Sequence, residues 1–277
     1  MINHDEMKKY YLDTVAVRRL SMDLSNLAGS CYTSVFSVLE LLSGVSEEEY
    51  GPRKAALTKL LSSGLEIDWR LPMELILESF HLHDRPGGIS ASDVKAIAEE
   101  LIASINYKDF MEKNKNLQPD INLLTFFDQR LSAEFKVTFL KKTNDIRDSR
   151  AEDRRTKFNP VHERGVRSLA DFICQSLLPS RLAGRSADVQ KNYNGSINRF
   201  IETWLGYYDL NANLLNEPST NDWADVLHVT YLDSSTDIVF VSDDKKIRNL
   251  LNKLIPDSSV SVDDFNISKK KSESTSS

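Results

Sequence analysis

Residues 237–244 read Asp-Ile-Val-Phe-Val-Ser-Asp-Asp, and this stretch decides the fold. Its β-branched and aromatic run, Ile238–Val241, lies between polar residues, which is the pattern of a short β-strand. Two acids, Asp243 and Asp244, follow the run directly. The stretch therefore predicts a strand that ends at a pair of carboxylates.

Other segments of the sequence also predict strands. The first is Met7–Leu12, which ends at Asp13 and is followed by apolar residues at helical spacing. Another is Leu65–Trp69, where apolar and polar residues alternate before a helix that begins near Pro72. The last lies around Val260–Val262. Strands that alternate with helices predict an α/β fold with a parallel sheet.

Helical spacing of apolar residues predicts the helices between these strands. One helix covers Val35–Leu42, ends near Gly44 and carries Glu40 among apolar residues. Another covers Ala55–Leu61. An acid on a helix that is otherwise apolar indicates that Glu40 has a partner, because a buried unpaired carboxylate is costly.

From Ser90 onward the pattern is helical only, and we expect a helical insertion over residues 81–215. Cys31 and Cys174 lie within apolar helical patterns, so both are expected to be small core residues. The lysine- and serine-rich end of the chain predicts a disordered tail over residues 267–277.

The composition, with 277 residues of which 40% are hydrophobic and 27% charged, is that of a globular protein. No apolar run approaches the roughly 20 residues that a membrane helix needs. The polar start, Met1–Lys9, is unlike a signal peptide. Two cysteines without a C-x-x-C pair fit a reducing compartment. These features predict a cytoplasmic protein without a membrane partner.

Positive charge is concentrated in one segment, although the formal net charge is -6. Residues 141–167 contain nine Lys or Arg against five Asp or Glu. Such a segment can bind the phosphates of a nucleic acid, and a solvated loop or helix face is the plainer alternative. The side chains expected to contact phosphate are Arg147, Arg150, Arg154, Arg155 and Lys157.

The acids that follow the predicted strands are candidate metal ligands. Ligands of open parallel sheets bind beyond the carboxyl ends of the strands, where Asp13 and the Asp243–Asp244 pair are expected. Asp225 is predicted in the first turn of a helix just before the strand that leads to Asp244. With Glu40, these carboxylates form a set that one divalent cation would satisfy.

Each acid also has a structural explanation. Asp13 can cap the helix that follows it, and Asp243 can complement a helix macrodipole. Glu40 is exposed if the helix is rotated by one position. The ordered set is therefore more informative than any of its members.

Other chemistries find little support in the sequence. It contains no G-x-x-x-x-G-K-[ST], G-x-G-x-x-G, H-E-x-x-H or G-x-S-x-G motif. The segment His81–Asp84 resembles a metal-binding His-Asp pair, but a helix end that turns at Pro86-Gly87-Gly88 explains it better.

The ordered acidic motifs resemble those of the PIN-domain nucleases. Residues 11–14, Tyr-Leu-Asp-Thr, are similar to the first strand of that family, and Thr33–Gly44 to its glutamate helix. Residues 225–229 and 241–247 are similar to its third and fourth acidic motifs, and residues 260–265 to its closing strand. The resemblance covers roughly residues 5–80 and 216–266, which would form one discontinuous PIN-like domain around the insertion at 81–215.

The resemblance implies Mg²⁺- or Mn²⁺-dependent hydrolysis of phosphodiester bonds, most often those of RNA and less often those of DNA. Asp13, Asp225 and Asp244 would be ligands, Glu40 a ligand or the base that orients water, and Asp243 a supporting acid. Thr14 and Ser242 would orient these acids.

Two features of the chain depart from the family pattern. Val15 stands where a polar residue is usual. The separation of Glu40 and Asp225 in the sequence is much longer than in compact members. We expect the inserted helices to select the substrate. The alternatives are an inactive nucleic-acid-binding module and a helical interaction protein, such as a toxin held by an inhibitory protein or a homo-oligomer.

Overall fold

The computed structural model describes residues 8–20, 24–43, 45–83, 90–113, 160–214, 220–232 and 237–275. The contacts divide the chain into two units. The first, here called the sheet unit, comprises Met1–Leu71, Ile89–Thr125 and Thr236–Ser277. The second, the helical unit, comprises Pro72–Gly88 and Phe126–Ser235. We describe each unit by itself.

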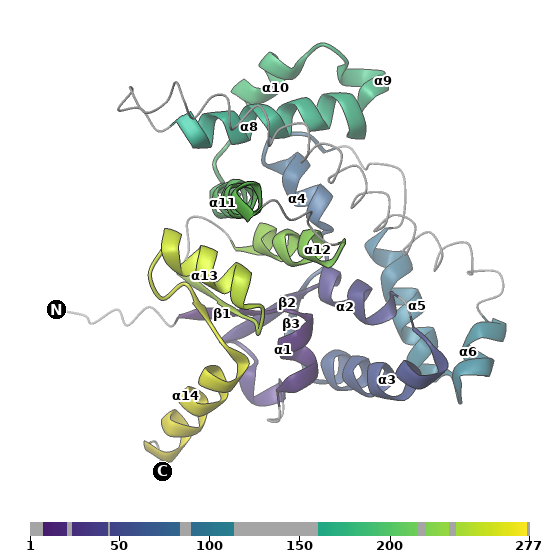
Figure 1. The fold of residues 1–277 in the computed structure, drawn as a ribbon. Helices are drawn as coiled ribbons and strands as arrows, with labels where there is room; N and C mark the ends of the chain where they lie inside the picture. Colours follow the sequence, from purple (N-terminus) through teal and green to yellow (C-terminus); the bar gives the residue numbers. More distant parts are fainter. Residues whose placement is uncertain are drawn as a thin grey trace. The chain divides into compact units, whose positions relative to one another are not determined.

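A five-stranded parallel sheet forms the centre of the sheet unit (Figure 1). Its order is β3-β2-β1-β4-β5. All residues of β2 and β4 are buried, so these strands lie inside the sheet and contribute to the core. The predicted α/β class with a parallel sheet is confirmed. The strands are β1 (Lys9–Leu12), β2 (Cys31–Ser34), β3 (Glu66–Asp68), β4 (Ile238–Val241) and β5 (Ser259–Val260).

The strand order reverses its direction between β1 and β4. The chain adds β2 and then β3 on one side of β1, and it adds β4 and then β5 on the other. Leu12, the last residue of β1, is paired with Val241, the last residue of β4. The two strands therefore end side by side, and the residues that follow them emerge at one point of the sheet edge.

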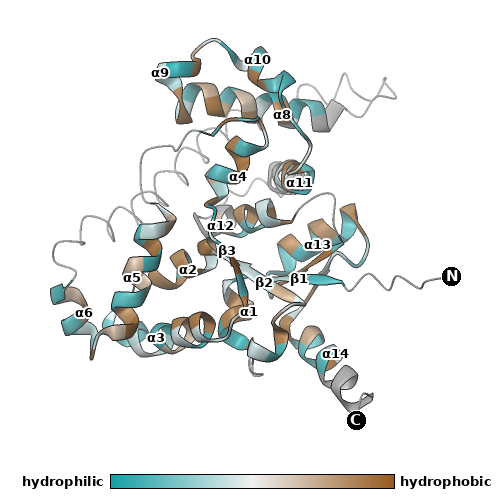
Figure 2. Ribbon diagram, turned by 180° about the vertical axis from the view of Figure 1, so that it is seen from behind, coloured by the Kyte–Doolittle hydropathy of each residue, from teal (hydrophilic) through white to brown (hydrophobic). Residues whose placement is uncertain are grey.

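Helices of the sheet unit lie on opposite sides of this sheet. In Figure 1, α13 lies on one side of the strands and α1 and α3 on the other, and Figure 2 shows the same arrangement from behind. The helices in Figure 2 carry both hydrophobic and hydrophilic segments, as expected for helices with one buried face. The helices are α1 (Thr14–Arg19), η1 (Leu24–Leu27), α2 (Val35–Leu42), α3 (Glu47–Ser62), α5 (Ala91–Ala103), α6 (Tyr107–Lys113), α13 (Lys245–Leu254) and α14 (Val262–Thr275).

Only helices are found in the described part of the helical unit. Gly165 of α8 allows a close approach to α11, because a Cβ atom at this position would lie 2.4 Å from Ile201 Cγ2. The elements are α4 (Pro72–Glu78), α8 (Pro160–Phe172), the π-helix η3 (Ile173–Leu177), α9 (Pro179–Leu182), α10 (Ser186–Lys191), α11 (Asn198–Leu214), α12 (Thr220–His228) and the 3-10 helix η4 (Val229–Tyr231). In the described part of the chain, no helix has the length and apolar character that a membrane crossing requires.

Strand β2 was not predicted from the sequence, which placed Cys31 in a helical pattern. The structure ends the strand at Ser34 and begins α2 at Val35, which confirms the helix predicted over Val35–Leu42. A turn at Gly29, with φ +86, precedes the strand. Because β2 is only four residues long and fully buried, it has no alternation of apolar and polar residues from which a strand could be recognised.

Two helices also differ from the predictions. Helix α12 begins at Thr220, so Asp225 lies beyond its first turn. Residues 267–275 belong to α14, where composition predicted a disordered tail. This helix has Asp263 and Asp264 in its first turn, where acids favour a helix start. Its Phe265 ring packs against the ring of Tyr10, with the two ring centroids 5.0 Å apart.

The predicted cysteine environments are confirmed, since Cys31 and Cys174 are both buried free thiols. Burial raises the pKa of the Cys31 thiol.

The contact division places α4 and α12 in the helical unit and α5 and α6 in the sheet unit. The predicted insertion over residues 81–215 stays a prediction.

Candidate functional site

Asp13 lies at the reversal point of the sheet, directly after β1. Its Oδ1 accepts a hydrogen bond of 2.7 Å from the backbone amide of Ala16, so Asp13 is the N-cap of α1. Its own amide donates to the carbonyl oxygen of Val241 at 3.3 Å. The side chain is buried, with 4% exposure. The capping role expected as an alternative is confirmed, and the predicted ligand role stays a prediction.

Ser242 and Asp244 follow the neighbouring strand β4 and repeat this arrangement. Ser242 Oγ accepts a hydrogen bond of 3.0 Å from the amide of Asp244. Asp244 Oδ1 in turn accepts from the amide of Ile247 at 2.7 Å, which makes Asp244 the N-cap of α13. The structure thus places one capping carboxylate after each of the two strands that flank the reversal point.

Asp243 connects two other elements of the sheet unit. Its Oδ1 accepts a hydrogen bond of 3.2 Å from the amide of Val262 at the start of α14. Its Oδ2 forms an ion pair with Arg19 of α1. These contacts give Asp243 a structural role, and its predicted role as a supporting acid stays a prediction.

Glu40 lies on α2, and all the remaining residues of this helix are buried. Its own side chain is half-buried, as expected for one acid on an apolar helix. Glu40 Oε2 accepts a hydrogen bond from Thr14 Oγ1 at the start of α1. The structure therefore brings Glu40 next to the residue that follows Asp13.

Thr33, which the sequence did not single out as a site residue, links the same elements. Its Oγ1 donates to the carbonyl oxygen of Leu12 at 2.6 Å and also contacts Ser37 Oγ of α2 at 3.0 Å. A buried hydroxyl on β2 thus joins the end of β1 to the helix that carries Glu40.

Asp225 lies on α12 in the helical unit, whereas Asp13, Glu40 and Asp244 lie in the sheet unit. Its participation in one site with those acids stays a prediction. The basic stretch with Arg147, Arg150, Arg154, Arg155 and Lys157 lies outside the described residues. The phosphate contacts expected of it are likewise untested.

The donor chemistry of the reversal point suits a hard cation. Carboxylate, carbonyl and water oxygens are the ligands that Mg²⁺ and Mn²⁺ prefer, and Asp13, Glu40 and Asp244 supply carboxylates. Among the side chains that the structure describes, however, no three Asp, Glu, His or Cys residues are grouped so that they could hold a metal ion. The donor types therefore fit, and their convergence on one ion stays a prediction.

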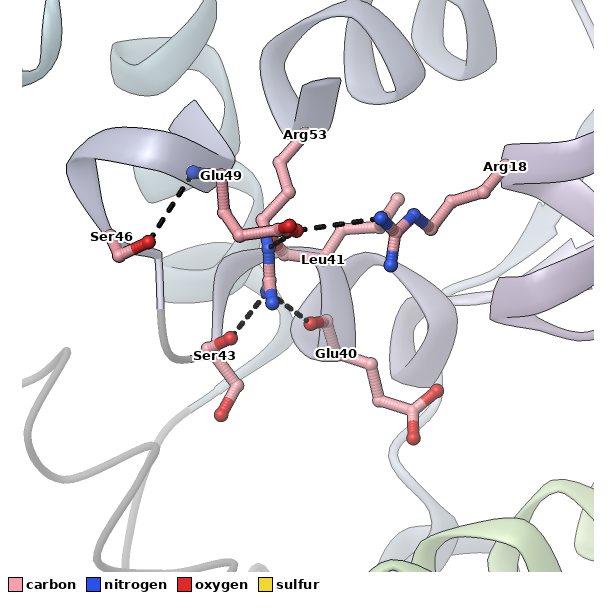
Figure 3. Close-up of polar contacts among 7 residues, drawn as sticks. All are labelled: Arg18, Glu40, Leu41, Ser43, Ser46, Glu49 and Arg53. Carbon is pink, nitrogen blue, oxygen red and sulfur yellow. Dashed lines mark hydrogen bonds and ion pairs between the residues drawn. The ribbon is translucent and has the colours of Figure 1, made fainter. Parts of the chain in front are cut away.

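Basic residues of α3 form a second feature that the sequence analysis missed. Arg53 Nη1 donates to the carbonyl oxygens of Glu40 and Leu41 at 3.0 and 3.2 Å, and also to that of Ser43 (Figure 3). Arg53 Nε donates to Glu49 Oε2 at 3.2 Å. The only sequence signal for this arrangement is the spacing of Glu49 and Arg53, which lie one helical turn apart.

Comparison with known proteins gave no match to a protein-family model, to a curated protein or to a solved structure. The resemblance to PIN-domain nucleases therefore depends on the acidic motifs and the class of fold.

Proposed function

We propose that this protein is a divalent-metal-dependent nuclease with a PIN-like fold, which hydrolyses phosphodiester bonds of RNA. One observation carries the proposal. Asp13 and the segment Ser242–Asp244 follow adjacent parallel strands on the two sides of the reversal in strand order. Open α/β sheets bind their ligands at this point. In this protein the reversal in strand order carries carboxylates, whereas an α/β protein that binds a dinucleotide has a glycine-rich loop there.

The proposed roles follow from the contacts of each side chain. Asp13 and Asp244 would hold the cation, since each is fixed by its capping bond at the end of a strand. The hydroxyl of Ser242 orients Asp244 by accepting a hydrogen bond from the Asp244 amide. The hydroxyl of Thr14 orients Glu40 by donating to the Glu40 carboxylate. Glu40 would orient the attacking water and accept its proton.

When bound, Mg²⁺ or Mn²⁺ would supply Lewis-acid chemistry at the scissile phosphate. Hydrolysis forms a bond between the water oxygen and phosphorus and breaks the bond to the 3′ oxygen, which takes a proton from solvent. The products then carry a 5′ phosphate and a 3′ hydroxyl. The helical unit would select the RNA. An inhibitory protein partner, as in a toxin and antitoxin pair, is compatible with this function.

Cleavage of labelled substrates tests the proposal. Single-stranded RNA and DNA would be incubated with Mn²⁺ and with the wild type, Asp13→Asn or Asp244→Asn. Asparagine caps a helix about as well as aspartate, so these variants remove the charge and keep the fold. Asp263→Asn is the matched control, because its side chain is 76% exposed and no ligand role is assigned to it.

Loss of cleavage in both site variants and not in the control supports the nuclease. Equal cleavage by all four proteins rejects the assignment of the site. RNA binding by the wild type without cleavage would instead favour the alternative of an inactive nucleic-acid-binding module.

A further inference from the structure

Helix α3 supplies cations to the carboxyl ends of three other helices in the sheet unit. Arg53 contacts the last carbonyl groups of α2, Lys54 contacts the carbonyl oxygen of Ser104, and Lys59 contacts that of Leu20 at 2.6 Å. Ser104 and Leu20 are the C-caps of α5 and α1. The last carbonyls of a helix have no partner within the helix, and a nearby cation stabilises them through the macrodipole.

The contact with α2 differs from the other two because this helix carries Glu40. No basic residue lies in the last turn of α2, so the compensating charge comes from Arg53. The Arg53 side chain is only 16% exposed, which limits screening of this interaction by solvent. One of the three carbonyl groups that Arg53 contacts belongs to Glu40 itself.

An ion pair with Glu49 fixes the orientation of Arg53. Glu49 Oε2 accepts from Arg53 Nε at 3.2 Å and lies 3.4 Å from Arg18 Nη2 of α1 (Figure 3). The same helix α1 begins with Thr14, which donates to the Glu40 carboxylate. Glu40 is therefore held at its backbone by Arg53 and at its carboxylate by Thr14, and Glu49 connects the two supports.

We infer that Arg53 is a positioning residue for Glu40, a role that rests on the proposed nuclease function. In Figure 3 the carboxylate of Glu40 points away from the guanidinium of Arg53. Arg53 thus fixes the backbone from which the carboxylate extends and does not neutralise that carboxylate. Its planar fork uses Nε and Nη1 on different acceptors, a geometry that a lysine ammonium does not reproduce.

Amide hydrogen exchange measures this positioning without reference to catalysis. The amide of Ser43 donates to the carbonyl of Leu39 at 2.8 Å and closes the last turn of α2. The amide of Ser104 does the same with Glu100 at 3.0 Å in α5. We expect Arg53→Gln to speed exchange at Ser43 by about tenfold, with little change at Ser104. The matched control Lys54→Gln should speed exchange at Ser104 and leave exchange at Ser43 nearly unchanged.

The steady-state kinetics of RNA cleavage then test whether this positioning serves the reaction. Arg53→Gln should lower kcat by about 10-fold to 100-fold with KM nearly unchanged, whereas Lys54→Gln should not. In a Glu40→Gln background, Arg53→Gln should cause no further loss, because residues that act as a unit are not additive. Arg53→Lys, measured in the same way, replaces Arg53→Gln if the latter does not fold.

Unchanged exchange at Ser43 in Arg53→Gln would overturn the inference. So would a loss of kcat on Arg53→Gln that is equally large in the wild type and in the Glu40→Gln background. Failure of the proposed function gives a different result. If the wild type does not cleave, or if Glu40→Gln cleaves normally, the nuclease assignment of Glu40 is rejected. The exchange at Ser43 still decides whether Arg53 holds the end of α2.

Discussion

The backbone amide of Asp13 donates a hydrogen bond to the carbonyl oxygen of Val241. This contact joins the ends of β1 and β4, which lie far apart in the sequence, at the point where the order of the sheet reverses. It places the residues after both strands, including two helix-capping carboxylates, at one edge of the sheet. The candidate site is therefore a consequence of strand pairing.

Variants of Asp13 should separate its capping role from its proposed catalytic role. Asp13→Ala removes the acceptor for the Ala16 amide and should lower the free energy of unfolding by about 1 kcal/mol. Asp13→Asn keeps an acceptor and should leave stability within about 0.5 kcal/mol. Both should abolish cleavage. Urea denaturation and an RNA cleavage assay measure the two effects, and an active Asp13→Asn variant would contradict the site.

Divalent cations should stabilise the folded protein if the strand ends bind them. A ligand at 100 times its dissociation constant adds about 2.7 kcal/mol to the free energy of unfolding. We expect urea midpoints to rise with Mn²⁺ concentration in the wild type and in Asp263→Asn. The rise should be lost in Asp13→Asn and Asp244→Asn. An equal rise in all four proteins would place the cation elsewhere.

The sequence predicted four of the five strands of the sheet. Strand β4 was recognised with its bounds as found, since its four residues form a β-branched and aromatic run between polar neighbours. Strand β2 was missed, because it is equally buried but has no such composition. The sequence singled out the acids, and their convergence on one site stays a prediction. Their contacts could not be predicted, because the partners of Glu40 and Asp243 come from other helices and are set by packing.

Asp243 should contribute to stability through the start of α14. Asp243→Ala removes the acceptor for the Val262 amide and one member of the pair with Arg19. We expect a loss of about 1 kcal/mol in urea denaturation. Arg19→Gln should cost less, because its side chain is exposed and exposed ion pairs are worth about 0–1 kcal/mol. An equal loss in both variants would assign the stabilisation to the ion pair.

Glycine at position 165 should be required by the packing of α8 against α11. A Cβ atom there would approach Ile201 Cγ2 to 2.4 Å and Leu205 Cδ1 to 2.8 Å. Overpacking by Gly165→Ala should therefore cost about 1–3 kcal/mol. A gain of about 1 kcal/mol in helix propensity offsets part of this cost, so the free energy of unfolding should fall by up to about 2 kcal/mol.

Gly51 of α3 is the matched control for Gly165, because a Cβ atom there meets nothing within 4 Å. Gly51→Ala should stabilise the protein by about 0.5–1 kcal/mol. Urea denaturation followed by tryptophan fluorescence measures both variants. Stabilisation by Gly165→Ala would show that the two helices can separate at little cost.

Tyr193 should make the helical unit sensitive to alkaline pH. Its hydroxyl donates to Asn198 Oδ1 at 2.7 Å, and burial raises the pKa of Tyr193 above its ordinary value near 10. The folded protein thus holds this proton more tightly than the unfolded chain does. The stabilisation is complete below about pH 10 and is lost as the pH rises through the folded-state pKa. In Tyr193→Phe, urea midpoints should fall less steeply above about pH 10 than in the wild type. Identical pH profiles for the two proteins would show that ionisation of Tyr193 is not coupled to unfolding.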